Sequence, residues 1–227
     1  MKLTLLEKVH LVDNVWAFRF RPNGPFDWTA GQYVRVELPH ENPDDEGTKR
    51  WFTNSAAPFE RIMQITTRIT GSTFKQALSD LEPGGELQLI ENPEGDFVWQ
   101  DSKLPIVFVA GGIGVTPFHS ILKQRVHDGL PLNVTLVYGG RTPDVPFKDE
   151  ITAWQAADPN LKVHYVVGKP LTAENLAKAV PALNQSFVYV SGPEPMVQAL
   201  SADLAKHGLP EVQIKRDEFP NYDTTNY

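Results

Sequence analysis

The first half of the chain contains short runs in which apolar and polar residues alternate. These runs occupy residues 15–20, 32–38 and 63–69. Alternation of this kind is typical of strands with one buried face. Turn-forming Pro, Gly, Asn and Asp residues separate the runs at 22–25, 39–47 and 83–85. The pattern predicts an antiparallel barrel, interrupted by one helix at 73–81.

From residue 104 onward, apolar runs alternate with helical segments. The first run, residues 106–110, is apolar throughout, as expected for a strand buried on both faces. Further strands are predicted at 134–138, 163–167, 187–190 and 212–214, and helices at 116–127, 148–157, 173–180 and 195–207. Repeated strand–helix units indicate a parallel sheet with helices on both faces. Because a polar segment at 100–104 separates the two patterns, we expect two domains, 1–100 and 104–227.

A glycine-rich loop directly follows the first buried strand of the second half. It contains Gly111, Gly112 and Gly114, and Thr116 and Pro117 open the helix behind it. Glycines let a phosphate approach the backbone closely, and a helix N-terminus offers free N–H groups to an anion. This context favours a nucleotide-binding loop, and a tight turn needed only for packing is the alternative.

Two other strands of the second half end in residues suited to the same ligand. Ser191, Gly192, Pro193 and Met196 follow the fourth strand, and Arg141 follows the second. Ligands of parallel sheets bind beyond the carboxyl ends of the strands, where an arginine accommodates the 2′-phosphate of NADP. The alternatives are an ordinary strand-to-helix turn and an exposed surface arginine.

A segment of the first half brings a cation, an aromatic face and a hydroxyl together. In an extended chain, Arg50 and Phe52 point to one side and Trp51 and Thr53 to the other, so the segment could grip an elongated cofactor. A structural strand with an outward arginine and inward aromatics is the alternative.

A second candidate anion site in the first half lies at the start of its helix. Gly71, Ser72 and Thr73 combine a flexible turn with small hydroxyl residues. Such residues are good N-caps, and together with the helix N-terminus they also bind phosphates. The sequence alone leaves capping and pyrophosphate binding equally open.

Composition narrows the chemistry. The net charge of -7 argues against nucleic acid as a partner, since phosphate backbones need clustered Lys and Arg. The chain has no cysteine, which excludes disulfides, thiolate nucleophiles and cysteine-ligated iron–sulfur clusters within it. The six histidines show no metal-ligand spacing, so no metal site is expected. No signal sequence or membrane span is evident, and a cytoplasmic location is expected.

Taken together, these motifs resemble those of the ferredoxin–NADP reductase superfamily, in the same order along nearly the whole chain. The similar segments are residues 50–53, 71–73, 92–97, 111–117 and 191–196. The chain departs from the family pattern at Phe52, where the family has Tyr, at Thr53, where it has Ser, and at Ser191, where it has Cys. Phe52 thus keeps the aromatic face but loses the phenol hydroxyl, Thr53 keeps a hydroxyl, and Ser191 replaces a thiol.

The resemblance implies a six-stranded antiparallel barrel that binds FAD, followed by a Rossmann-like α/β domain that binds NADPH or NADH. It implies that Arg50 pairs with the pyrophosphate of FAD, that Phe52 lies against the flavin ring, and that Thr53 bonds near its reactive edge. The remaining cofactor-binding residues that it implies are Asn54, Thr66, Thr67, Arg68, Gly71, Ser72, Thr73, Thr116, Pro117, Gly192, Pro193 and Met196.

The C-terminal segment completes this expected site. Members of the family often place a C-terminal aromatic over the flavin, and Phe219, Tyr222 and Tyr227 are the candidates here. A frayed terminus is the alternative. By the same resemblance, Thr53, Ser191 and Glu218 are the candidate catalytic residues.

The function implied is an FAD-dependent NAD(P)H oxidoreductase. Hydride passes from NAD(P)H to FAD, and because the chain supplies no iron–sulfur cluster, the electrons leave to an external acceptor, a small molecule or a redox protein. Two rival functions remain open: a non-catalytic flavoprotein that senses redox state, and a nucleotide-binding protein that has lost its flavin.

Overall fold

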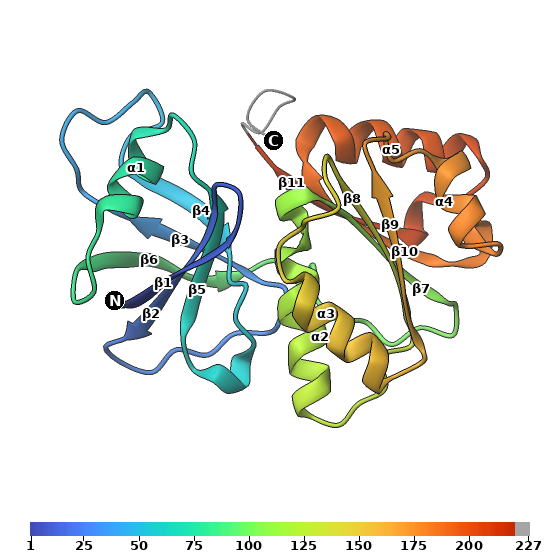
Figure 1. The fold of residues 1–227 in the computed structure, drawn as a ribbon, viewed down its shortest axis with the longest axis horizontal. Coiled ribbons are helices and arrows are strands. Elements are labelled where there is room, and N and C mark those ends of the chain that lie inside the picture. Colours follow the sequence, from blue (N-terminus) through green and yellow to red (C-terminus); the bar gives the residue numbers. More distant parts are fainter. Residues whose placement is uncertain (221–227) are drawn as a thin grey trace.

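The computed structural model describes residues 1–220, which form two sheets lying side by side (Figure 1). The first is antiparallel, with the strand order β4-β3-β6-β1-β2-β5. Its elements are β1 (Lys2–Val12), β2 (Val15–Pro22), β3 (Tyr33–Glu37), β4 (Lys49–Thr53), β5 (Met63–Arg68), β6 (Glu86–Glu94), the helix α1 (Thr73–Asp80) and the 3-10 turn η1 (Pro58–Glu60).

The predicted alternation explains how this sheet closes. Inward residues such as Phe18, Val34 and Ile65 are fully buried in one core, and α1 covers that core with Phe74 and Leu78. The edge strands β4 and β5 meet at one end, where the N–H of Ser55 donates to the carbonyl of Gln64 at 3.0 Å. The result is a six-stranded half-barrel.

The second sheet is parallel, with the order β11-β10-β7-β8-β9. Its strands are β7 (Ile106–Gly111), β8 (Val134–Gly140), β9 (Leu161–Val167), β10 (Phe187–Pro193) and β11 (Ile214–Phe219). Its helices are α2 (Thr116–His127), α3 (Lys148–Ala157), α4 (Ala173–Ala179) and α5 (Glu194–Lys206), with 3-10 turns η2 (Gly112–Val115), η3 (Leu183–Gln185) and η4 (Glu211–Gln213). The predicted fold class, an antiparallel barrel-like sheet followed by a parallel α/β sheet, is confirmed; the division at 100–104 stays a prediction.

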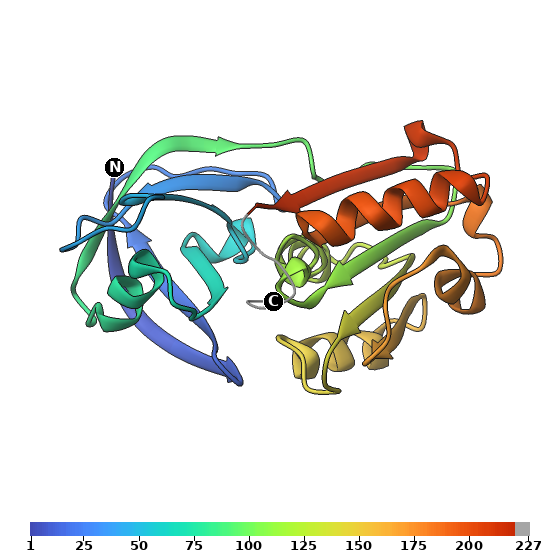
Figure 2. The same cartoon turned by 90° about the horizontal axis from the view of Figure 1, so that it is seen from above.

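The parallel sheet has a separate core on each face. Residues of α2 and α3, such as Phe118 and Ile151, pack on one face, and residues of α4 and α5, such as Leu176 and Leu200, pack on the other. Figure 2 shows β7 and β11 pointing toward the half-barrel. The carboxyl ends of these strands therefore face the first half of the chain, where ligands of such sheets bind.

The last strand was predicted too early. Residues 212 and 213 belong to the turn η4, and β11 runs from Ile214 to Phe219. Its sequence is mostly charged, but as an edge strand it needs only backbone pairing with β10, from Val188 with Ile214 to Pro193 with Phe219. Glu218 and Phe219, predicted to lie in a tail, are therefore held in a sheet.

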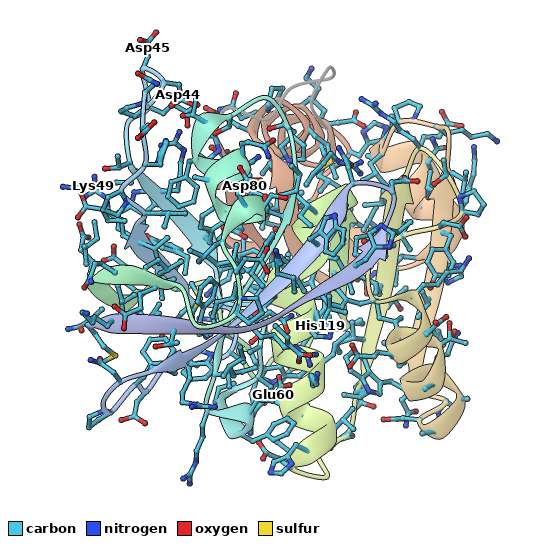
Figure 3. All side chains as sticks on the ribbon, turned by 60° about the vertical axis from the view of Figure 1, so that its left-hand side comes forward. Asp44, Asp45, Lys49, Glu60, Asp80 and His119 are labelled. Atoms are coloured by element: carbon cyan, nitrogen blue, oxygen red, sulfur yellow. The ribbon has the colours of Figure 1, made fainter. Side chains whose placement is uncertain are left out.

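Polar contacts from α2 join the two halves. His119 Nδ1 lies 2.7 Å from the carbonyl of Ser55, Ser120 Oγ donates to the carbonyl of Ala56 at 2.6 Å, and Lys123 forms an ion pair with Glu60 (Figure 3). His119 also stacks on Phe147, with ring centroids 3.7 Å apart. These contacts hold the half-barrel against the start of α2. Within residues 1–220, no helix is both long and apolar enough to cross a membrane.

Candidate active site

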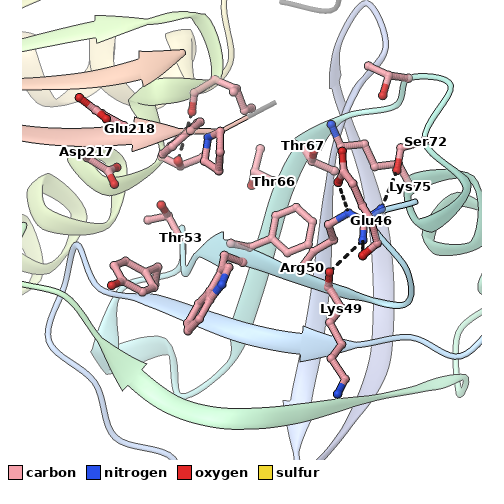
Figure 4. A pocket seen from close by; sticks show the side chains of 18 of the residues that line it. Glu46, Lys49, Arg50, Thr53, Thr66, Thr67, Ser72, Lys75, Asp217 and Glu218 are labelled. Atoms are coloured by element: carbon pink, nitrogen blue, oxygen red, sulfur yellow. Dashed lines mark hydrogen bonds and ion pairs between the residues drawn. The ribbon is translucent and has the colours of Figure 1, made fainter. Parts of the chain in front are cut away.

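A cleft of about 1280 Å³ opens between the half-barrel and the parallel sheet (Figure 4). Many of the residues predicted to bind cofactor line it. They are Arg50, Phe52, Thr53, Thr66, Thr67, Gly71, Ser72, Thr116 and Phe219. Residues from both sequence halves thus meet in one elongated cavity, large enough for a dinucleotide.

The middle of the cleft combines hydroxyl groups with aromatic rings. Thr53, Thr66 and Thr67 come from the neighbouring ends of β4 and β5, and each is at least nine-tenths buried. Phe52 also lines the cleft and packs against Phe74 of α1, with ring centroids 5.8 Å apart. A flat, partly polar ring system fits such a surface.

One end of the cleft is an anion-binding corner formed by Arg50 and the start of α1. The guanidinium of Arg50 is largely buried and pairs with two carboxylates of the preceding loop, at 2.8 Å from Asp44 and 2.8 Å from Glu46. It also donates to the carbonyls of Glu46 and Gly47 in the loop and of Lys49 in β4, and it reaches Ser72 Oγ at 3.5 Å. Lys75 lines the cleft from the first turn of α1.

Asp44 links this arginine to the helix. One carboxylate oxygen accepts from Arg50 Nη2, and the other accepts the backbone N–H of Thr73 at 3.1 Å. Burial of the carboxyl opposes ionisation, but the Thr73 N–H and the Arg50 guanidinium outweigh it and lower the pKa of Asp44 below its ordinary value. Asp44 is therefore ionised at neutral pH.

The opposite wall of the cleft comes from β11. Asp217, Glu218 and Phe219 line it, and Ser191 Oγ of β10 donates to Asp217 Oδ2 at 2.9 Å. Burial of the Asp217 carboxyl and the nearby charge of Glu218 raise its pKa to about 7, against the lowering effect of Ser191. In Figure 4, Thr53 at the end of β4 lies across the cleft from Asp217.

The glycine-rich loop lies against the end of β10. A Cβ atom on Gly114 would lie 2.2 Å from the carbonyl oxygen of Ser191, so only glycine fits there. Gly112 has a φ of +50°, in the region that favours glycine. The two predicted nucleotide-binding motifs, residues 111–117 and residues 191–196, are thus adjacent in space. Their close packing accounts for Gly114 even without a ligand.

Other predicted residues lie outside the cleft lining. Asn54 is fully buried, and its Oδ1 accepts the N–H groups of Gln64 and Ala56, which ties β4 to β5. The Arg68 guanidinium donates to Asn14 Oδ1. The remainder are Thr73, Gly111, Gly112, Gly114, Pro117, Arg141, Ser191, Gly192, Pro193 and Met196, of which Arg141 is exposed just beyond β8. Tyr222 and Tyr227 lie outside the described residues.

Several residues of the cleft lining were not predicted, among them Tyr33, Asp44, Lys75 and Asp217. Burial and the charges of Glu94 and Asp217 raise the pKa of Tyr33. Asp44 belongs to an acidic loop that reads as a solvated turn, and Asp217 depends on the pairing of β11 with β10. The position of Lys75 in the first turn of a helix predicted to bind an anion is the one signal that could have identified any of them.

The residues fit a flavin dinucleotide in most respects. The cleft offers a cation and a helix N-terminus at one end, hydroxyls and aromatic rings in the middle, and a polar wall at the other end. Gly95 lies in the cleft where a Cβ would come within 2.7 Å of the Tyr33 ring, so the chain has no room for a side chain there. Among residues 1–220, no group of three His, Cys, Asp or Glu could hold a metal ion.

Comparison with known proteins gives related results for both halves. Residues 108–202 match the model of the oxidoreductase NAD-binding domain. A flavohemoprotein of Burkholderia sp. (strain TH2) is 27% identical over 230 residues, covering 93% of this chain and 57% of that protein. The FAD/NAD-binding domain of a nitric oxide dioxygenase from Vibrio cholerae has a TM-score of 0.83 at 20% identity, covering 96% of this chain and 98% of that chain. A ferredoxin–NADP⁺ reductase from Neisseria gonorrhoeae, with bound FAD and NADP, has a TM-score of 0.80 at 17% identity, covering 98% of each chain.

Proposed function

We propose that this chain, which has the ferredoxin–NADP reductase fold and carries an oxidoreductase NAD-binding domain, is an FAD-dependent NAD(P)H oxidoreductase. The observation that supports this most is the cleft, because it joins the predicted flavin residues of β4, β5 and α1 to Thr116 and the β11 wall. The chain spans little more than half of the flavohemoprotein that it matches, so the electron acceptor is part of the proposal.

The half-barrel would hold the flavin. Arg50, Ser72 and the start of α1 would bind the pyrophosphate, and Phe52 would lie against the ring. Thr53, Thr66 and Thr67 would hydrogen-bond to its polar edge from the ends of β4 and β5. Bound FAD would supply the redox chemistry, two-electron reduction by NAD(P)H followed by release of electrons to an acceptor.

The parallel sheet would bind and orient the nicotinamide nucleotide. The glycine loop would face the nucleotide phosphates, and Arg141 would contact a 2′-phosphate, which favours NADPH. Thr116, Ser191 and Asp217 would surround the nicotinamide end. Because Asp217 has a pKa near 7, it can hold a proton beside that site at neutral pH. Glu218, on the same wall, stays a candidate catalytic residue.

The acceptor would be external to this chain. No cysteine is available for an iron–sulfur cluster, so electrons would pass to a separate redox protein, to another domain or to a small molecule. Such transfer needs the flavin edge to be reachable, and the cleft is an open one lined by exposed Trp51.

Anaerobic mixing tests the proposal. NADPH or NADH added to the FAD-loaded protein should bleach the visible absorbance of the flavin. Thr53→Val should slow the bleaching roughly tenfold or more by removing a hydrogen-bond partner, whereas Thr53→Ser, which keeps the hydroxyl, should stay close to the natural rate. If neither nucleotide bleaches the flavin, hydride transfer is refuted.

A further inference from the structure

The anion-binding corner of the cleft already contains an anion that the chain itself supplies. Asp44 lies between Arg50 and the first backbone N–H of α1, with its two oxygens 2.8 Å and 3.1 Å from these donors. A phosphate held by an arginine and a helix N-terminus would use the same donors. The carboxylate therefore lies where a phosphate oxygen would bind.

The loop holds Asp44 in this position through further contacts. The Asp44 N–H donates to Thr73 Oγ1 at 3.0 Å, and His40 Nε2 lies 3.0 Å from the same hydroxyl. Thr73 was predicted to help bind the pyrophosphate. Its N–H donates to the Asp44 carboxylate and its hydroxyl accepts the Asp44 N–H, so both groups are already bonded to the loop. Hydrogen bonds among β4, α1 and the loop that connects β3 to β4 thus hold the corner in place.

The two carboxylates of this corner also oppose a phosphate. Arg50 and Lys75 contribute two positive charges, but Asp44 and Glu46 contribute two negative charges, each 2.8 Å from the Arg50 guanidinium. A phosphate must either displace a carboxylate from a largely buried arginine or approach the cluster while both remain. Each route weakens binding, because like charges at such distances repel strongly when screening by water is reduced.

We propose that Asp44 is a specificity residue that competes with the phosphate groups of the flavin nucleotide. It lowers the affinity of the cleft for FAD and FMN, and leaves the affinity for riboflavin, which has no phosphate, unchanged. This inference rests on the proposed flavin site. Its consequence is a flavin nucleotide that exchanges more readily than it would on an unblocked arginine.

Binding titrations followed by flavin fluorescence test this directly. FAD, FMN and riboflavin are titrated into the natural protein, Asp44→Asn and Asp45→Asn. Asp45 is a matched control, since it is exposed on the same loop (Figure 3) and forms no hydrogen bond or ion pair within residues 1–220. Asp44→Asn should tighten FAD and FMN binding roughly tenfold and change riboflavin binding less than twofold, and Asp45→Asn should change all three less than threefold.

A second comparison separates competition from a general change in the loop. In an Arg50→Ala background, Asp44→Asn should raise the logarithm of the FAD affinity by at most half as much as it does in the natural protein. The reason is that the Arg50 guanidinium, one of the two donors for which Asp44 and a phosphate compete, is gone. Riboflavin binding reports whether the cleft of each variant is folded. If Asp44→Asn prevents folding, Asp44→Ser, which also removes the charge, is used in its place, and the same result is expected.

The possible results distinguish the two proposals. Unchanged or weaker FAD binding in Asp44→Asn, or equal tightening of riboflavin, would overturn the role of Asp44 and leave the flavin site intact. If the natural protein and all variants bind none of the three flavins, the proposed function itself fails, and the inference fails with it.

Discussion

Two helix N-termini face the candidate site, and they differ in what lies against them. At α1, the Asp44 carboxylate accepts hydrogen bonds from the N–H of Thr73 and from the neighbouring Arg50. At the start of η2 and α2, glycines bring the loop against the end of β10, with Gly114 against the Ser191 carbonyl. In the first half a carboxylate side chain thus occupies the helix N-terminus, whereas in the second half the residues before the helix include glycines, which have no side chain. If the role proposed for Asp44 holds, the affinity of a helix N-terminus for phosphate depends on what covers it as well as on the helix itself.

The largest expected effect comes from adding a methyl group to the glycine loop before α2. Gly114→Ala places a Cβ 2.2 Å from a backbone oxygen, which requires the loop or β10 to shift. We expect a loss of about 3 kcal/mol in the free energy of unfolding, measured by urea denaturation, together with loss of NAD(P)H binding. Gly71→Ala, before α1, is the control, because its Cβ would meet nothing within 4 Å and should change stability by less than about 0.5 kcal/mol. Equal losses at both sites would contradict the contrast.

Two carboxylates in the cleft sharpen the comparison, because the structure lowers the pKa of Asp44 and raises that of Asp217 to about 7. Asp217 is protonated more easily in the folded chain than in the unfolded one. Its contribution to stability is therefore fully present below its ordinary pKa of 3.8 and is lost as the pH rises toward 7.

Asp217→Asn should remove this loss. Relative to the natural protein, the variant should gain on the order of 2 kcal/mol of unfolding free energy between pH 5 and pH 8, measured by urea denaturation at both values. Asp217→Asn should also flatten the pH dependence of flavin reduction near pH 7. Glu218→Gln, which removes a charge that helps to raise the pKa of Asp217, should shift this pH dependence toward lower pH. An identical pH profile for the natural protein and Asp217→Asn would contradict the raised pKa.

Arg141 tests whether the nucleotide half uses a side-chain cation in the way that the flavin half uses Arg50. Arg141→Ala should lower the ratio of kcat/KM for NADPH to that for NADH roughly tenfold, if it contacts the 2′-phosphate. Arg125→Ala, which removes a cation that packs on Trp99 away from the cleft, is the control. An unchanged ratio in Arg141→Ala would exclude this contact.

The smallest expected effect concerns Glu150 of α3, which pairs with His119 and Lys123, two of the α2 residues that contact the first half. Burial opposes ionisation of Glu150, but the hydrogen bond and charge of His119 and the charge of Lys123 lower its pKa to about 2. Its stabilising effect is therefore present above pH 4.5 and is lost as the pH falls toward 2. Because the side chain is 41% exposed, Glu150→Gln should cost only about 1 kcal/mol at pH 7. The difference from the natural protein should shrink at pH 3, and a constant difference would argue against the ion pair as its cause.

Much of the fold could be predicted from the sequence because hydrophobic periodicity reports burial directly. The helices 116–127 and 148–157 agree with α2 and α3 at both ends. The alternating run 15–20 lies in β2, and the run 63–69 agrees with β5 except for its last residue. β11 escaped prediction because an edge strand is defined by backbone pairing, which leaves a charged sequence such as Lys215 to Glu218 without a strand pattern. β1 and β6 were not singled out either, since many of their residues are polar or only partly buried.

The sequence by itself determined the order of the motifs, the lack of thiol ligands and the types of side chain available to the site. Only the tertiary structure decided which of them share a cleft, because Thr53, Thr66, Thr116 and Asp217 come together through strand pairing and through the contacts of α2. It also decided the state of Arg50. From the sequence, Arg50 is simply a cation in a motif. Its pairing with Asp44 and Glu46 depends on the path of the loop between β3 and β4, and the hydrophobic periodicity of the sequence does not predict that path.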